Sequence, residues 1–128
     1  MGKVISAFLL SFSIVFSQEL NHIKDILNFT ENIMSSLPEE KTLKTVEKNA
    51  INKRTVKTFK KFLSEIKDKK IIGYRKFHTK EIYDLLFKVS YIVKYKNGVS
   101  VIVFYFYKPE QKWFLYDLSF DNDVKSFF

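Results

Sequence analysis

The sequence predicts an α+β fold in which two to three N-terminal helices pack on one face of a four-stranded antiparallel sheet. Apolar residues recur at three- and four-residue spacing between residues 19 and 66, which is the period of a helix with one buried face. From Tyr74 onward the chain holds all seven Tyr, the single Trp and eight of the fourteen Phe, residue types that strands favour. Asn97-Gly98 lies between two of these aromatic runs and is a preferred centre for a tight hairpin turn.

The composition limits the kinds of site that the chain can build. With 128 residues, of which 46% are hydrophobic, it has the size of one domain and is not disordered. It contains no Cys and only three Gly, which excludes disulfides, thiol nucleophiles, Cys-ligated metals and glycine-rich phosphate loops. The two histidines, His22 and His78, have no carboxylate motif beside them, so we expect no metal and no cofactor.

Residues 1–17 read as a signal peptide. Lys3 supplies the positive charge, Val4 to Phe16 form the apolar stretch, and Ser17 allows cleavage before Gln18. The alternative is an uncleaved anchor, but the apolar run of about 13 residues is shorter than the roughly 20 that span a bilayer. We therefore expect an exported protein, periplasmic or secreted, whose residues 18–128 form a single domain.

Three helices are expected in the first half of that domain. The first covers residues 19–36. The second begins with Pro38 at its first helical position, where a missing N–H costs nothing. The apolar stripes of the second and third helices do not share one phase, so the sequence predicts a break at residues 49–52. The third helix then runs to about residue 66.

Four strands are expected in the second half, at residues 70–78, 85–96, 99–107 and 112–120. With Asn97 and Gly98 at the centre of the hairpin turn, Lys96 pairs with Val99, and this pairing fixes which residues share a face. The terminal Phe127-Phe128 is expected to pack on the sheet edge.

The hairpin register divides the two central strands into an apolar face and a mixed face. The face expected to pack on the helices holds Phe87, Val89, Tyr91, Val93, Tyr95, Ile102, Phe104 and Phe106. The mixed face holds Lys88, Ser90, Ile92, Lys94, Val99, Val101, Val103, Tyr105 and Tyr107. The mixed face is apolar enough to call for a dimer partner, a long loop or a ligand.

The fourth strand has two possible registers, which depend on the length of the preceding loop. An odd length puts Phe114, Tyr116, Leu118 and Phe120 on the helix face and Asp117 on the mixed face, within reach of Lys88 or Lys94. An even length puts Trp113, Leu115 and Asp117 on the helix face, where burial raises the pKa of a carboxyl group. We favour the odd length because it separates apolar from polar residues better.

The segment "YIVKYKNGVSVIVFYFYKPEQKWFLYDLSFD", residues 91–121, resembles the strands of small exported members of the nuclear-transport-factor-2-like (cystatin-like) superfamily. Its "KWFLYDLSF" stretch also resembles the closing strand of the periplasmic phospholipid-carrier (toluene-tolerance) family. The first resemblance implies a curved sheet that wraps the helices into a cone-like shape with an open mouth. It also implies, for the enzymes of that superfamily, an Asp or His inside the cone beside a Tyr or Asp donor.

We expect an exported, non-catalytic domain that binds a small apolar or amphipathic ligand, such as a lipid, or a protein partner, with homodimerisation through the sheet compatible with either. The expected ligand-binding residues are the aromatic ones of the strands: Tyr91, Tyr95, Phe104, Phe106 and Trp113.

Two other functions remain open. One is an enzyme that uses a buried Asp117 with Tyr91 and Tyr95, which requires the even-length loop. The other is an envelope module that contacts anionic lipid through the third helix, because residues 38–80 contain fourteen basic and five acidic residues. The basic side chains expected on its exposed side are Lys53, Arg54, Lys57, Lys60 and Lys61. Nucleic acid attracts the same charge, but the export signal argues against it.

Overall fold

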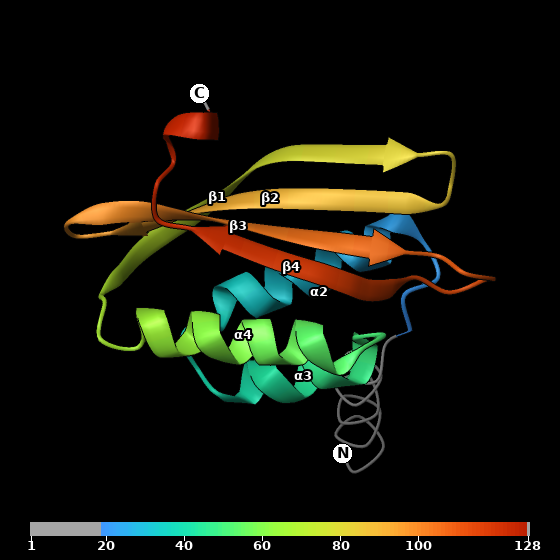
Figure 1. The fold of residues 1–128 in the computed structure, drawn as a ribbon, viewed down its shortest axis with the longest axis horizontal. Coiled ribbons are helices and arrows are strands. Elements are labelled where there is room, and N and C mark those ends of the chain that lie inside the picture. Colours follow the sequence, from blue (N-terminus) through green and yellow to red (C-terminus); the bar gives the residue numbers. More distant parts are fainter. Residues whose placement is uncertain (1–18, 128) are drawn as a thin grey trace, which may run out of the picture.

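The computed structural model describes residues 19–127, so the expected signal peptide lies outside the described residues (Figure 1). The chain forms helices first and strands second, and the expected fold class is confirmed. The sheet is fully antiparallel, with strands in the order β1-β2-β3-β4. The elements are α2 (Ile23–Ser35), α3 (Lys41–Asn49), α4 (Lys53–Ile66), β1 (Ile71–Ile82), β2 (Leu86–Tyr95), β3 (Gly98–Tyr107), β4 (Phe114–Asp121) and the 3-10 helix η1 (Lys125–Phe127).

Local hydrogen bonds set the helix boundaries. The carboxylate of Asp25 accepts the backbone N–H of His22 at 2.9 Å, just before α2 begins. The break between α3 and α4 lies where the sequence predicts it, because Asn52 Oδ1 accepts the N–H of Thr55 at 2.9 Å and caps α4. The expected start of the second helix is wrong. Pro38 lies in a turn in which Glu39 N donates to the Ser36 carbonyl at 2.8 Å, and α3 begins only at Lys41.

One core joins the helices to the sheet. The helices lie on one side of the sheet, with α3 and α4 alongside β4 (Figure 1). We call the opposite side of the sheet the outer face. The eight residues of β2 and β3 expected on the helix side are all buried in this core, so that prediction is confirmed. The helices contribute Ile26, Phe29, Ile33, Met34, Val46, Phe59, Phe62, Leu63 and Ile66.

The hairpin between β2 and β3 differs from the expected register by two residues. Tyr95 pairs with Gly98, so the turn is centred on Lys96-Asn97 rather than on Asn97-Gly98. The faces are unaffected because side chains alternate with a period of two. Among the described residues, positive φ values occur at Tyr83 (50°) and Asp84 (54°), in the turn between β1 and β2. Both central residues of a type I′ turn need such values, and the Leu85 N–H closes this turn on the Ile82 carbonyl at 2.9 Å.

A bulge at Tyr116 divides β4 into two parts. The part after the bulge has the register expected for the odd loop length, and the part before it has the register expected for the even length. Tyr105 pairs with Asp117, whereas the next residue, Phe106, pairs with Leu115. Leu118 therefore reaches the core, as the odd loop length predicts, and Leu115 does too, as the even length predicts. The bulge buries apolar side chains from both ends of the strand.

The C-terminal segment crosses from β4 to the edge strand β1, beside which η1 lies (Figure 1). The ring of Phe127 meets that of Phe77 edge-on, with centroids 6.4 Å apart. The expected packing on the sheet edge is confirmed for Phe127, whereas Phe128 is outside the described residues. Within residues 19–127, no helix is both long enough and apolar enough to cross a membrane.

Candidate functional site

The five aromatic residues expected to bind a ligand are all buried core residues between the sheet and the helices. The ring of Tyr91 lies edge-on to Phe104 with centroids 6.1 Å apart, Phe106 meets Phe29 at 5.9 Å, and Trp113 meets Phe87 at 6.4 Å. A ligand on these five side chains would have to displace aromatic packing. Their use in ligand binding remains a prediction.

Tyr91 links the sheet to α2 through its hydroxyl group. The hydroxyl lies 2.9 Å from Thr30 Oγ1 and donates to Glu31 Oε2 at 3.1 Å. Burial is the largest cause that raises the pKa of Tyr91, and the negative charge of Glu31 adds to it. This tyrosine is a structural hydrogen-bonding residue with all of its ring in the core.

Tyr95 is the inner-face tyrosine whose hydroxyl lacks a partner. Its Oη is buried and has no hydrogen-bond partner among the described residues. The nearby Ser100 Oγ donates to Asn122 Oδ1 at 2.5 Å. Burial raises the pKa of Tyr95, and the adjacent Ser100 hydroxyl offsets part of that shift. The Lys69 ammonium lies 4.8 Å from the ring centroid.

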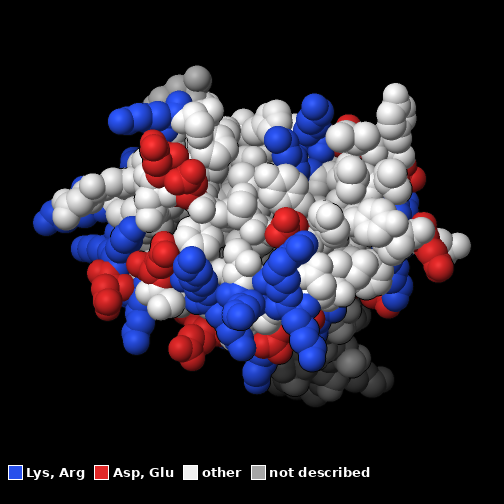
Figure 2. All heavy atoms as spheres, viewed as in Figure 1, with Lys and Arg blue, Asp and Glu red and all other residues white. Residues whose placement is uncertain are grey.

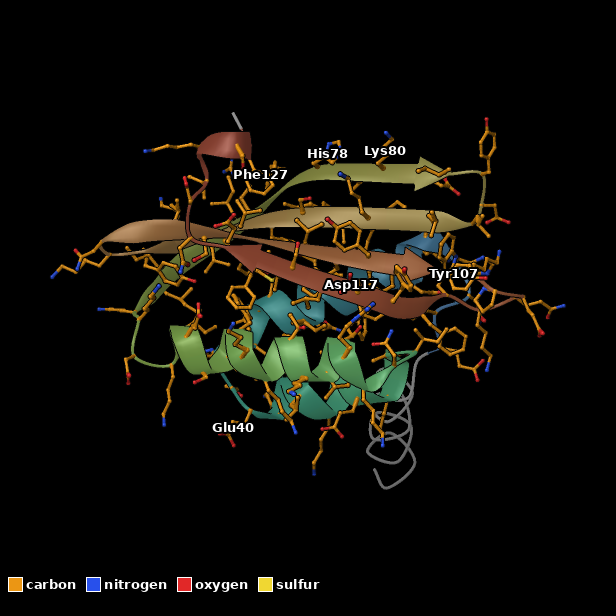
Figure 3. The ribbon with its side chains drawn as sticks, in the orientation of Figure 1. Glu40, His78, Lys80, Tyr107, Asp117 and Phe127 are labelled. Atoms are coloured by element: carbon orange, nitrogen blue, oxygen red, sulfur yellow. The ribbon has the colours of Figure 1, made fainter. Side chains whose placement is uncertain are left out.

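Asp117 lies on the outer face, where it pairs with Tyr105 across the strands. Tyr91 and Tyr95 lie on the other side of the sheet, so the Asp117–tyrosine constellation of the enzyme hypothesis is not assembled. Asp117 Oδ1 accepts the Leu118 N–H at 2.8 Å. Among the described residues, Asp117 makes no ion pair with Lys88 or Lys94. Figure 3 shows Asp117 on β4, an edge strand of the sheet.

The outer face is apolar along β3, whereas β4 presents Asp117, Ser119 and Asp121 beside it. Val101 and Val103 point away from the helices, yet they are only 1% and 4% exposed. Val101 pairs with Ile92 and Val103 pairs with Ser90, and the rings of Tyr107 and Tyr116 lie 6.2 Å apart at one end of the face. In Figure 2 this side of the molecule is a broad white area with one acidic residue near its centre.

The same face is basic along β1 and β2. Lys80 pairs directly with Lys88, and His78 and Arg75 follow on β1 opposite Ser90 and Ile92. Figure 3 shows His78 and Lys80 on the edge strand. Two like charges directly opposed on one face destabilise a sheet. Among the described residues, neither lysine makes an ion pair.

Sequence reasoning missed the Lys80–Lys88 pair because it ended the first strand at residue 78. The strand continues to Ile82, and a tight turn at Tyr83-Asp84 brings the two lysines together. The stretch from His78 to Ile82 has no alternation of apolar and polar residues, so periodicity gives no signal that extends the strand.

The basic residues expected on the third helix lie as predicted on its solvent side. Lys53, Arg54, Lys57, Lys60 and Lys61 are exposed, whereas Phe59, Phe62, Leu63 and Ile66 fill the core. Within residues 19–127, none of these five basic side chains is in an ion pair. In the same part of the chain, no cluster of three or more His, Asp or Glu could hold a metal ion.

The chain is similar to proteins of known structure. The chain shares its fold with two DUF4783 family proteins. The first, from Bacteroides ovatus, superposes with a TM-score of 0.53 at 12% identity, over 70% of this chain and 91% of that one. The second, from Bacteroides uniformis, has a TM-score of 0.52 at 16% identity, over 72% and 94%. No family model matches the chain, and no curated protein is similar to it.

Proposed function

We propose that the protein is an exported, non-enzymatic binding domain whose outer face holds an amphipathic anion, a molecule with an apolar chain and a negatively charged head group. The observation that carries the proposal is the direct opposition of Lys80 and Lys88 beside an apolar strand. An anion bound between the two ammonium groups removes their repulsion and replaces it with two charge-assisted contacts.

The apolar part of the ligand lies along β3. The half-buried Tyr105 and Tyr107 offer the accessible apolar surface of β3, since Val101 and Val103 are almost fully covered, and Tyr105 pairs with Lys88. Burying an apolar chain there contributes roughly 25 cal/mol for each Å² removed from water. A head group at Lys88 and a chain over β3 therefore use adjacent parts of the same face.

The resemblance to the nuclear-transport-factor-2-like superfamily would place a ligand between helices and sheet. The α+β arrangement agrees with that resemblance, and membership in the superfamily remains part of the proposal. We place the ligand on the outer face because the inner aromatic residues are packed against one another. Lipids are the class of ligand that fits both the chemistry of the face and an exported protein.

Native mass spectrometry of the chain purified from an exporting host tests the proposal. We expect a mass increase of a few hundred daltons that is lost on organic extraction. The variant Lys80→Gln/Lys88→Gln should lose the added mass, because both head-group contacts are removed while the core is untouched. A matched control, Lys57→Gln/Lys61→Gln, removes the same charge from α4 and should keep it.

Three outcomes would overturn the proposal. A bare mass for the wild-type chain means that no small ligand is held. Equal loss in both variants means that the ligand follows net charge rather than the outer face. A bare mass at twice that of the monomer means that a second copy covers β3.

A second candidate function is contact between α4 and an anionic lipid surface. It is favoured by the five exposed basic side chains of α4, none of which pairs with an acid of the described chain. Each basic residue near such a surface contributes around 1 kcal/mol. Loss of the ligand from Lys57→Gln/Lys61→Gln, with retention in Lys80→Gln/Lys88→Gln, would favour this candidate.

A further inference from the structure

We propose that one end of the molecule docks on a lipid bilayer, with Tyr83 and Leu85 entering the head-group region. This end, which we call the loop end, is where the β1–β2 turn, the β3–β4 loop and the start of α4 meet (right side of Figure 1). The loop end adjoins the outer face and shares Lys80 and Lys88 with it, but the apolar side chains that carry this proposal are different ones.

Backbone contacts hold the segments of the loop end together. Lys108 N donates to the Leu85 carbonyl at 3.0 Å, and the Lys108 ammonium lies 3.2 Å from the Asp84 carboxylate. At the start of α4, Ile51 N donates to the Leu115 carbonyl at 2.9 Å. The loop end is therefore one surface and not a set of independent loops.

Exposed apolar side chains gather at the loop end. Within residues 19–127, six of the nine large apolar side chains that are exposed lie here. They are Ile51, Ile82, Tyr83, Leu85, Leu86 and Tyr116. A contiguous group of this kind on a soluble domain marks a contact with a protein or a membrane.

Tyr83 is the exposed apolar side chain whose presence is least accounted for by packing within the domain. It is 94% exposed, so it contributes almost nothing to the core, and it occupies a turn position with φ of 50°. Asn or Gly occupies the left-handed region at lower cost than a bulky aromatic residue. A costly backbone conformation at an exposed aromatic residue points to a contact outside the domain, and tyrosine is enriched at membrane–water interfaces.

The first described residues, Glu19 and Leu20, are held at the loop end by the β3–β4 loop. Trp113 N donates to the Leu20 carbonyl at 2.7 Å, and the Lys112 ammonium lies 2.7 Å from the Glu19 carboxylate.

The charge of the loop end suits an anionic bilayer. The basic residues at this end and on the adjoining strand positions are Lys53, Arg54, Lys80, Lys88, Lys108 and Lys112. The acidic ones are Glu19, Glu81, Asp84 and Glu110. Asp84 and Glu19 are each paired with a lysine, which leaves, among the described residues of this end, four basic side chains without an ion pair (Lys53, Arg54, Lys80 and Lys88) against two acidic ones, Glu81 and Glu110. We expect anionic vesicles to bind roughly tenfold more tightly than neutral ones.

Single-site labelling tests directly which end of the molecule contacts the bilayer. It is possible at any chosen position because the chain contains no native Cys. An environment-sensitive dye is attached to Leu85→Cys at the loop end, to Lys60→Cys on α4, or to Asn97→Cys in the β2–β3 turn. The chain as isolated from the exporting host is mixed with phosphatidylglycerol/phosphatidylethanolamine vesicles or with phosphatidylcholine vesicles. We expect a blue-shifted emission, quenched by lipid-attached quenchers, at residue 85 alone and more strongly with phosphatidylglycerol.

Two substitutions check that the tyrosine makes the contact. Tyr83→Asn relaxes the turn and should preserve the fold, yet it should weaken vesicle binding on the order of tenfold. Ile72→Ser removes an apolar residue that is 59% exposed at the far end of β1 and should leave binding unchanged.

Several results would overturn the proposal. A shift at residue 60 in place of residue 85 would mean that α4 meets the lipid. A shift at residue 85 without vesicles, which grows with protein concentration, would mean that a second copy covers the loop end. Vesicle binding with no shift at residue 85, or no vesicle binding at all, would remove the loop end as a docking surface.

Discussion

The two faces of β3 carry apolar side chains in similar measure, but helices cover only one of them. The inner face presents Ile102, Phe104 and Phe106, which pack under the helices. The outer face presents Val101, Val103 and Tyr105, on the side that lacks helices. The difference teaches that β3 carries more apolar side chains than packing against the helices requires. The outer face is where we place the function.

The strongest test of the comparison is to truncate one side chain on each face of β3. Phe104→Ala should lower the free energy of unfolding by about 3–5 kcal/mol, because it leaves a large cavity between Tyr91 and the helices. Val103→Ala, one residue away and facing outward, should cost about 1 kcal/mol. Urea unfolding of both variants measures the difference, and equal losses would mean that the two faces are equally integral to the core.

High pH should lower the stability of the folded state through Tyr91, which lies on the inner face of the sheet. The folded state holds the pKa of Tyr91 above its usual value of 10.0, mainly because the residue is buried. Above pH 10 the unfolded chain loses the proton while the folded chain keeps it, so stability falls as pH rises. By pH 11 the loss from this residue reaches about 1.4 kcal/mol, and below pH 10 its contribution does not change.

Unfolding measured between pH 8 and 11.5 checks this expectation. Tyr91→Phe should remove part of the decline and so flatten the profile. An unaltered profile in that variant would contradict the assignment of the decline to Tyr91.

The two inner tyrosines should respond differently to loss of their hydroxyls. Tyr91→Phe removes hydrogen bonds to Thr30 and Glu31 and should cost about 1 kcal/mol. Tyr95→Phe removes a buried hydroxyl that has no partner among the described residues, so stability should stay the same or rise. Thermal unfolding of the two variants side by side measures the contrast. A clear loss in Tyr95→Phe would show that its hydroxyl has a partner after all.

The smallest expected effect concerns the hairpin turn. Gly98 opens β3 with a φ that is not positive, and a Cβ added there meets no atom within 4 Å. Gly98→Ala should therefore change stability by less than about 1 kcal/mol and in the stabilising direction. A large destabilisation, measured by urea unfolding, would instead support the Asn97-Gly98 turn that the sequence suggests.

The sequence correctly predicts which side chains of β2 and β3 face the helices, because that prediction depends only on the alternation of odd and even positions along each strand. The register of β2 against β3 differs from expectation by two residues, and an even shift leaves Tyr91 and Phe104 on the same side. The break before α4 is equally local, since Asn52 caps the helix that follows it.

The rest depends on contacts that are distant in the chain. The bulge at Tyr116 forms because both Leu115 and Leu118 find places in the core, and neither register by itself allows this. The Lys80–Lys88 pair depends on a turn at Tyr83-Asp84, where the residue types do not favour positive φ. The residues of β2 and β3 on the outer face could be identified from the sequence. The basic residues that β1 adds to this face could be identified only from the structure.

The most direct test of the central claim is a methyl NMR titration with dodecyl phosphate below its micelle concentration. Valines on the two sides of the sheet serve as internal probes, with Val99, Val101 and Val103 outside and Val89 and Val93 inside. Binding on the outer face predicts that the outer valine methyls shift in a saturable way while the inner ones stay in place. Shifts at Val89 and Val93 would put the ligand between sheet and helices, and no shift at any valine would contradict the proposed function.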